Sequence, residues 1–83
     1  MLNQPIILKV IPHRDFSLNL KLSDSRELKL DMLPLIKYPC YRKLSNLGLF
    51  FQVKCDDDII YWDDMHDMHI DQILEFGKFM SNG

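Results

Sequence analysis

Residues 16–31 read FSLNLKLSDSRELKLD. Apolar and polar side chains alternate on both sides of a polar break at residues 23–26. Strict alternation places the apolar side chains on one face of a strand, and a polar break between two such runs is typical of a hairpin turn. The stretch therefore predicts two antiparallel strands with one buried apolar face and one solvent-exposed polar face. The apolar positions are Phe16, Leu18, Leu20, Leu22, Leu28 and Leu30.

A further strand is predicted before this hairpin, at residues 6–11. Its apolar side chains fall on both faces, so we expect it to be covered on both sides or to form part of an interface. Simple alternation places Ile6, Leu8 and Val10 on one face and Ile7 and Ile11 on the other. Pro12 follows and favours a turn, because proline cannot donate to a strand ladder.

The rest of the chain predicts shorter elements. Asp31 can cap a short helix over residues 32–36, which ends before Pro39. A final helix is indicated by apolar side chains at helical spacing, from His69 or Ile70 to about Met80. The elements expected between them are a short helix from 45 or 46 to 51, strands at 52–56 and 59–62, and a loop at 63–67.

These elements predict an α+β fold. We expect one antiparallel sheet of about five strands in two hairpins, with a short middle helix and a C-terminal helix packed on one face. The 83 residues suit a single domain spanning 1–83, and 47% hydrophobic residues with a net charge of -2 argue against disorder. A domain this small buries only about 60% of its unfolded surface, so we expect it to associate as a dimer or larger species.

Several classes of protein are excluded at this level. The first residues lack the basic start and uninterrupted apolar run of a secretory signal. No apolar run approaches the roughly 20 residues of a membrane span. Cys40 and Cys55 lack CxxC spacing, so both are expected to be free thiols in a reducing compartment. We expect a cytoplasmic protein without a cofactor.

Charge is distributed unevenly along the chain. Residues 1–50 hold eight Lys or Arg and four Asp or Glu, whereas residues 51–83 hold two and eight. Such asymmetry can mark an acidic surface that meets a basic partner. Alternatively, the folded domain mixes these charges in space.

Short segments form a series along the chain: LKVIP at 8–12, DFSLNL at 15–20, LDM at 30–32, YRKL at 41–44, FQV at 51–53, IYW at 60–62 and DMHIDQILE at 67–75. Over residues 6–75 this series resembles a bacterial family, the domain of unknown function 2442. The resemblance implies a small α+β domain with two hairpins, a short helical segment and a last helix. It implies no catalytic activity.

The same resemblance suggests a setting for the protein. Members of the family often lie beside another small uncharacterised protein, in an arrangement similar to toxin–antitoxin pairs, and some carry a helix-turn-helix domain after this module. The chain departs from the family pattern at its first turn and in one later loop. Ser25 replaces the usual glycine, Asp63, Asp64 and Met65 replace a proline and a glycine, and His69 with Ile70 replaces a helix start of Ser-Pro or Cys-Pro.

One stretch, residues 63–71, combines carboxylates with imidazoles. These ligands suit Zn, Ni, Mn or Fe. If the last helix begins early, His66 and His69 lie one turn apart with Asp63 adjacent, which would give a three-ligand metal site and a metal-dependent enzyme. The stretch lacks an HExxH pattern. The alternative is a solvated acidic loop in which Asp67 stabilises the start of the helix.

Nucleic-acid binding is a second alternative. A basic patch could form from Arg14, Arg26, Lys29, Arg42 and Lys43, with Arg14, Arg42 and Lys43 as the first candidates and Tyr38 and Tyr41 stacking on bases. The chain is acidic overall and has no basic stripe, so we do not expect it to bind nucleic acid by itself. A nucleic-acid-associated transcriptional regulator stays open as an alternative.

The function expected first is contact between proteins. Tyr61 and Trp62 are neighbours at the end of a strand, so one should face inward and the other outward. The outward member could join Ile7 and Ile11 in an apolar patch that pairs two copies. We therefore expect a non-enzymatic module that binds itself and a small partner protein, as the antitoxin-like member of a two-protein system.

Overall fold

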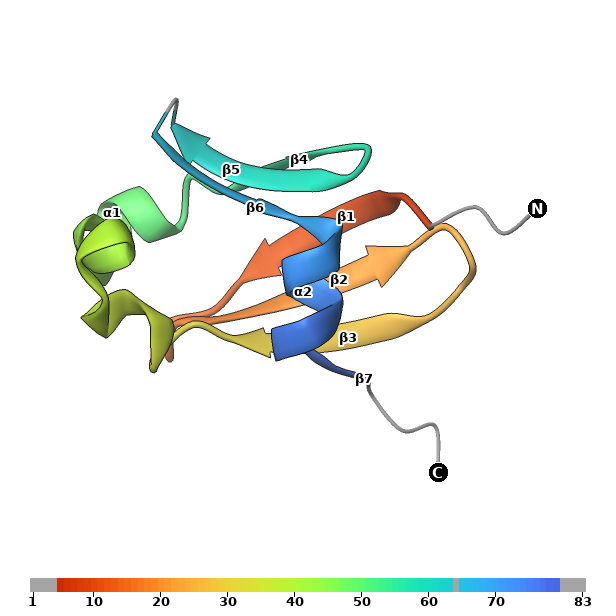
Figure 1. The fold of residues 1–83 in the computed structure, drawn as a ribbon, viewed down its shortest axis with the longest axis horizontal. Helices are drawn as coiled ribbons and strands as arrows, with labels where there is room; N and C mark the ends of the chain where they lie inside the picture. The colour runs from red at the N-terminus through yellow and green to blue at the C-terminus, as the bar shows by residue number, and fades with distance from the viewer. Residues whose placement is uncertain (1–4, 64, 80–83) are drawn as a thin grey trace.

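The computed structural model describes residues 5–63 and 65–79, which form two antiparallel sheets and four short helical segments. The first sheet has strand order β1-β2-β3-β7 and the second has order β4-β5-β6 (Figure 1). In chain order the elements are β1 (Ile7–Pro12), β2 (Ser17–Leu22), β3 (Glu27–Asp31), η1 (Leu35–Lys37), η2 (Pro39–Ser45), α1 (Leu47–Phe50), β4 (Lys54–Asp56), β5 (Ile59–Asp63), β6 (His66–His69), α2 (Ile70–Phe76) and β7 (Lys78–Phe79).

The hairpin predicted from residues 16–31 is confirmed as β2 and β3. Leu18 pairs with Leu30 and Leu20 with Leu28, and all four side chains are buried. The lysines, Asn19 and acidic residues between them point the other way, because neighbours in a strand face opposite sides. The leucine face therefore lies in the core and the polar face stays open.

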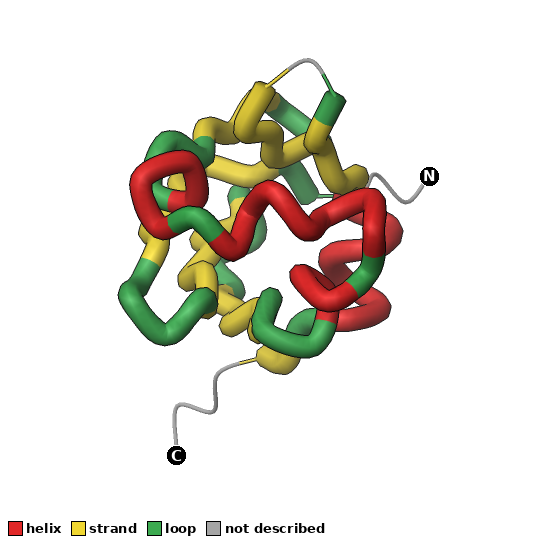
Figure 2. The backbone as a smooth tube through the Cα atoms, turned by 90° about the vertical axis from the view of Figure 1, so that its left-hand side faces the viewer, coloured by secondary structure: helices red, strands yellow, loops and turns green. Residues whose placement is uncertain are grey.

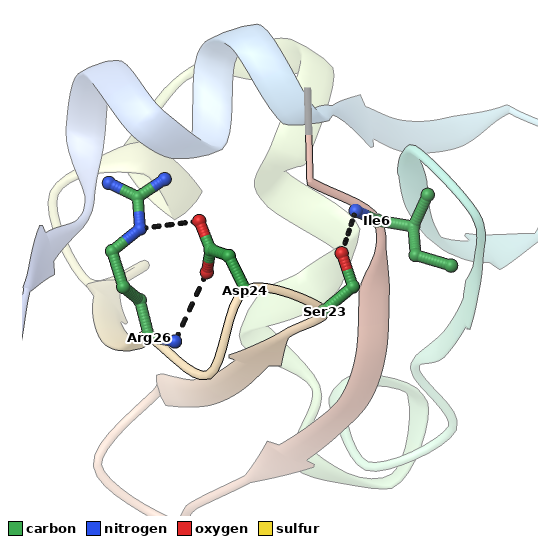
Figure 3. A network of polar contacts seen from close by, with 4 residues as sticks. All are labelled: Ile6, Ser23, Asp24 and Arg26. Atoms are coloured by element: carbon green, nitrogen blue, oxygen red, sulfur yellow. Dashed lines mark hydrogen bonds and ion pairs between the residues drawn. The ribbon is translucent and has the colours of Figure 1, made fainter. Parts of the chain in front are cut away.

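The two turns of the first sheet have the same geometry. In each, a residue with positive φ closes the loop, Phe16 at 63° and Ser25 at 73°. An aspartate precedes each of these residues and accepts a hydrogen bond from a backbone N–H two positions later, Asp15 from Ser17 and Asp24 from Arg26. Figure 3 shows the second turn, where Arg26 also pairs with Asp24. Both loops belong to the common hairpin type in which the last loop residue adopts the left-handed backbone conformation.

A bulge in β1 changes which side chains reach the core. The register with β2 shifts between Ile7 and Lys9, so that Ile7 faces Leu22 and Val10 faces Leu20. Ile7 is buried and Leu8 is 55% exposed. The expectation that Ile7 shares a face with Ile11 is therefore wrong, because one extra residue in a strand reverses the alternation beyond it.

The middle of the chain is helical near the two predicted positions, as η1 and α1, and the further segment η2 lies between them, where no helix was predicted. The segments η1, η2 and α1 gather at one end of the sheets (Figures 1 and 2). The side chain of Asn46 caps α1 by accepting a hydrogen bond from the N–H of Leu49. Phe50, in α1, is fully buried and contacts the rings of both Phe16 and Trp62.

The single sheet of about five strands is not confirmed, because the strands divide between two sheets. The predicted hairpin at 52–56 and 59–62 is present as β4 and β5. Residues 66 and 67 of the expected loop belong instead to a further strand, β6, which pairs with β5. In β6, buried His66 and Met68 alternate with exposed Asp67 and His69. This short alternation within a polar segment is the signal that the sequence interpretation missed.

The last helix starts at Ile70 as predicted and lies across one face of the first sheet (Figure 1). It ends at Phe76, before the predicted end near Met80, which lies outside the described residues. The chain then turns at Gly77 into β7, which pairs with β3. The final strand thus replaces the last turn of the expected helix.

The two sheets share one hydrophobic core. Ile7 and the leucines of β2 and β3 belong to the same buried cluster as Ile60, Trp62 and Met68 of the second sheet. A short backbone hydrogen bond also joins the sheets at the β4–β5 turn, where the N–H of Ile7 donates to the carbonyl of Asp57 at 2.7 Å. The N–H of Ile70, the first residue of α2, donates to the carbonyl of Asp58 at 2.7 Å and continues the β5–β6 pairing of the second sheet.

Candidate binding surface

Two of the residues predicted to form an apolar interface lie in the core. Ile7 is 4% exposed and Trp62 is 6% exposed, so neither is available to a second molecule. The indole Nε1–H of Trp62 donates to the carbonyl of Phe50 at 3.0 Å. Ile11 is 41% exposed on β1 and Tyr61 is half-buried on β5, so the two stand on different sheets. Trp62 is thus the inward member of its pair, as predicted for one of the two, but the predicted patch of Ile7, Ile11 and the outward member does not form.

The predicted metal ligands do not converge. His66 Nδ1 lies 2.7 Å from Asp63 Oδ1, and this hydrogen bond, with one from the N–H of Met65, lowers the pKa of the Asp63 carboxyl. His69 lies three positions further along the same strand and is exposed, whereas His66 is buried. Residues three apart on a strand face opposite sides, so the helical geometry expected for this pair is wrong. Over residues 5–63 and 65–79, no group of three or more His, Cys, Asp or Glu side chains is placed to hold a metal ion.

The residues proposed to touch nucleic acid occupy separate elements. Arg14 lies in the β1–β2 turn, whereas Arg42 and Lys43 lie in η2. All three are exposed. The hydroxyl of Tyr41, in the same segment, donates to the carbonyl of Asp67 at 3.4 Å, and Tyr41 is partly buried against the core. This contact leaves Tyr38, 58% exposed, as the accessible aromatic ring of the segment.

A different surface emerges at the end of the first sheet, beside β3 and β7. It contains a cleft of about 690 Å³ between the polar face of the sheet and the segment that follows β3. Three of its side chains are large, apolar and about half exposed: Leu33 at 47%, Tyr38 at 58% and Phe76 at 48%. The complete lining is Asp15, Ser17, Lys29, Asp31, Leu33, Pro34, Leu35, Tyr38, Phe76 and Lys78.

The carboxylates of this cleft are engaged in local structure. Asp15 accepts hydrogen bonds from the hydroxyl and the N–H of Ser17, and these bonds, with the charge of Lys29, hold the pKa of Asp15 below its usual value. Asp31 accepts a hydrogen bond from the N–H of Leu33 at 3.1 Å, which turns the chain after β3. Both carboxylates thus shape the loops that carry the apolar side chains.

The lysines of the cleft, unlike its carboxylates, have no described side-chain hydrogen bond or ion pair. Lys29 and Lys78 face each other across β3 and β7. Neither takes part in an ion pair with a described carboxylate within 4 Å. The cleft therefore combines an apolar rim with two ammonium groups and two carboxylates, Asp15 and Asp31, a combination suited to holding a ligand that carries both apolar and charged groups.

The sequence interpretation missed this surface for two reasons. Leu33, Pro34 and Tyr38 come from an irregular segment, where no periodicity shows which way a side chain points. Phe76 did carry a signal, because it stands outside the apolar stripe of Ile70 and Ile73 on the last helix. A large aromatic residue off that stripe indicates an exposed contact position.

Comparison with known families identifies the chain. A family model described as protein of unknown function (DUF2442) matches residues 7–79. The chain belongs to the DUF2442 family. The match confirms the resemblance found in the sequence and extends it from residue 75 to β7, so it includes Phe76 and Lys78 of the cleft.

The DUF2442 match is not accompanied by a match to a curated protein or to a solved structure. In the part of the chain that the structure describes, no helix is long and apolar enough to cross a membrane.

Proposed function

We propose that this DUF2442 protein is a non-enzymatic protein-binding module whose contact surface is the cleft beside β3 and β7. The observation that carries the proposal is the gathering of Leu33, Tyr38 and Phe76, each about half exposed, around one concavity. Apolar side chains scattered singly over a surface need no explanation, whereas a contiguous group with a polar border is typical of an interaction site.

The chemistry of the cleft supports recognition more than reaction. Its described lining contains no histidine or cysteine, and the hydroxyl of Ser17, itself buried, donates to Asp15. Covalent catalysis requires a nucleophile with an adjacent base that a substrate can reach, and the burial of Ser17 keeps its hydroxyl away from a substrate. Tyrosine and phenylalanine at the rim instead provide rigid contact area, and tyrosine is enriched among the residues that dominate binding energy.

The partner we propose is another small protein, with self-association as a further possibility for the same surface. The position of family members beside a second small protein supports this choice, and with it an antitoxin-like role in a two-protein system. A domain of this size also gains stability when a partner covers part of its surface.

Co-expression with the product of the adjacent gene tests the proposal. We expect the two proteins to purify together, and we expect Tyr38→Ser and Phe76→Ser each to weaken the complex by roughly tenfold, since central aromatic contacts carry much of the binding energy. Met65→Ser is the matched control, because Met65 is 85% exposed in the β5–β6 turn and does not line the cleft.

Light scattering on the free protein separates the two kinds of partner. A dimer that Tyr38→Ser dissociates would show self-association through the cleft. A complex that both cleft variants leave intact, with melting temperatures unchanged, would contradict the proposal.

A further inference from the structure

The open face of the first sheet carries a regular array of lysines. Because β1, β2, β3 and β7 pair in register, their outward side chains fall into rows across the sheet. The first row is Lys9, Lys21 and Glu27. The second row is Ile11, Asn19, Lys29 and Lys78. We call these two rows the lysine face.

Two pairs of like charges face each other directly on the lysine face. Lys9 is opposite Lys21, and Lys29 is opposite Lys78. Like charges opposite one another in an antiparallel pair are destabilising. The described ion pairs within 4 Å are Arg26 with Asp24 and His66 with Asp63, so no described carboxylate neutralises these lysines by direct contact. Each pair has one opposite charge nearby, since Lys21 also faces Glu27 on β3 and the charge of Lys29 acts on Asp15.

The sign of this surface opposes that of the chain. The protein has a net charge of -2. Its lysine face holds four lysines and one glutamate, with Asp31 on β3 and Asp15 in the β1–β2 turn next to it. Polar residues that weaken a fold are expected where they serve a function. A surface of positive charge on an acidic domain favours a partner of negative charge.

The lysine face continues into the apolar cleft. Lys29 and Lys78 belong to both, and Leu33 and Phe76 lie in the same cleft. A second, smaller hollow of about 220 Å³ lies on the face itself, lined by Lys9, Ile11, Asn19, Leu20, Lys21 and Glu27. A ligand that covers both regions needs anionic groups along its length and an apolar group at one end.

We propose that the lysine face docks an acidic segment of a partner polypeptide, whose carboxylates meet Lys9, Lys21, Lys29 and Lys78 while an apolar side chain enters the cleft. This inference deepens the proposed function and rests on it, since it names the chemistry of the partner. A polypeptide fits better than a nucleic acid, because the rows contain no aromatic side chain on which a base could stack.

A labelled peptide of twelve residues, in which glutamate and leucine alternate, is the probe. Fluorescence anisotropy should show binding that weakens by about tenfold when NaCl is raised from about 50 to about 300 mM, because salt screens exposed charges. The same peptide with lysine in place of glutamate should not bind. A peptide with serine in place of leucine should bind more weakly, because it leaves the cleft empty.

The decisive variant is the double change Lys9→Glu with Lys78→Glu. Each new glutamate faces a lysine, Lys21 or Lys29, so the melting temperature should stay the same or rise while affinity for the acidic peptide falls by at least about tenfold. Lys54→Glu is the control, since Lys54 is exposed on β4 of the other sheet. It should leave affinity unchanged.

The outcomes separate this inference from the proposed function. Peptide binding that is lost in Tyr38→Ser but kept in the double lysine variant would overturn the acidic partner and leave the protein-binding surface intact. No binding of the acidic peptide would also overturn it, while the co-expression test of the cleft stands independently. Tighter, lysine-dependent binding of a duplex DNA of twenty base pairs would replace the polypeptide with a nucleic acid.

Discussion

Phe16 and Ser25 occupy the same place in two turns of the same kind. Both have positive φ, and both follow an aspartate that accepts a backbone hydrogen bond. A left-handed conformation costs a residue with a side chain roughly 1–2 kcal/mol. Phe16 gains from its position, because its ring packs edge-on against Phe50 with centroids 5.3 Å apart. Ser25 is exposed and gains no such packing.

Ser25→Gly should therefore stabilise the protein, by about 1 kcal/mol, because glycine adopts this conformation without a Cβ penalty. Urea unfolding followed by circular dichroism measures the change. Phe16→Gly is the matched comparison at the equivalent position. It should destabilise the protein, since the loss of ring packing outweighs the relief of the backbone. Two glycine variants that shift stability in the same direction would contradict this account of the turns.

The contact between Asp63 and His66 predicts a pH dependence. The hydrogen bonds from His66 and the N–H of Met65 lower the pKa of Asp63 in the folded state below its ordinary value of 3.8. As pH falls through the folded-state pKa, the carboxyl is protonated and its stabilising contacts are lost, so the unfolded state binds more protons in this window and stability declines. Unfolding free energies between about pH 6 and about pH 2 should fall less steeply for Asp63→Asn. Parallel profiles for the two proteins would show that the contact does not stabilise the fold.

At the scale of elements, helix α2 ends where its last residues meet β3. The N–H of Gly77 donates to the carbonyl of Ile73 at 2.7 Å, and β7 begins at the next residue. A Cβ at position 77 would lie 2.5 Å from Cδ1 of Leu28 and 2.7 Å from the carbonyl oxygen of Ile73. The close approach of the chain to β3 thus requires glycine, even though its φ is ordinary for any residue.

Gly77→Ala should destabilise the protein by about 1–3 kcal/mol, because backbone atoms have to move to admit the methyl group. Chemical unfolding gives the value directly. Gly48→Ala, in α1, provides the control, since the nearest atom to its added Cβ is the side-chain oxygen of Asn46 at 3.1 Å. Its effect should be smaller, because alanine favours helix and the asparagine side chain can adjust. Equal losses for both variants would show that Gly77 has no special packing role.

The bulge in β1 is an element-level feature that decides which side chains of the strand reach the core. It turns Ile7 into the core and leaves Leu8 exposed near the edge of the sheet. It also brings Lys9 opposite Lys21 on the outward face. Bulges commonly re-aim side chains in this way. Without the extra residue, the strand could not bury Ile7 and Val10 together and present Lys9 and Ile11 to solvent.

For the whole molecule, we expect the two sheets to unfold as one cooperative unit. Their buried residues form one cluster, and the N–H of Ile7 in the first sheet donates to the carbonyl of Asp57 in the β4–β5 turn of the second. Neither sheet can separate without exposing leucines of the first or Trp62 of the second. A shared core is the usual basis of two-state unfolding in small domains.

Two probes should therefore report one transition. Trp62 is the single tryptophan and senses the second sheet, while amide exchange in β2 senses the first. Urea midpoints from tryptophan fluorescence and far-UV circular dichroism should coincide, and the amide of Ile7, which bonds to the second sheet, should be protected nearly as well as those of β2. A tryptophan transition that precedes loss of the β2 amides would show that the sheets unfold separately.

Local pattern alone determined the most regular parts of this protein. The alternation of leucines in β2 and β3 predicts which face of each strand is buried, because successive side chains on any strand point to opposite faces. The start of α2 at Ile70 and the β4–β5 hairpin follow from apolar spacing and an acidic turn in the same way. The family resemblance was also present in short segments of the sequence.

Tertiary structure decided the rest. Residues 66–69 form a strand because β5 lies beside them and pairs with them. Helix α2 ends before Gly77 because the residues that follow pair with β3 as β7. The position of the bulge in β1 follows from its pairing with β2, which places Ile7 opposite Leu22 and Val10 opposite Leu20. The cleft and the lysine face join residues far apart in the chain, such as Lys29 with Lys78. Periodicity in the sequence predicts which side chains of one element share a face. Sheet edges, bulges and binding surfaces depend on which other elements pack beside it, and the sequence pattern of one element does not contain that information.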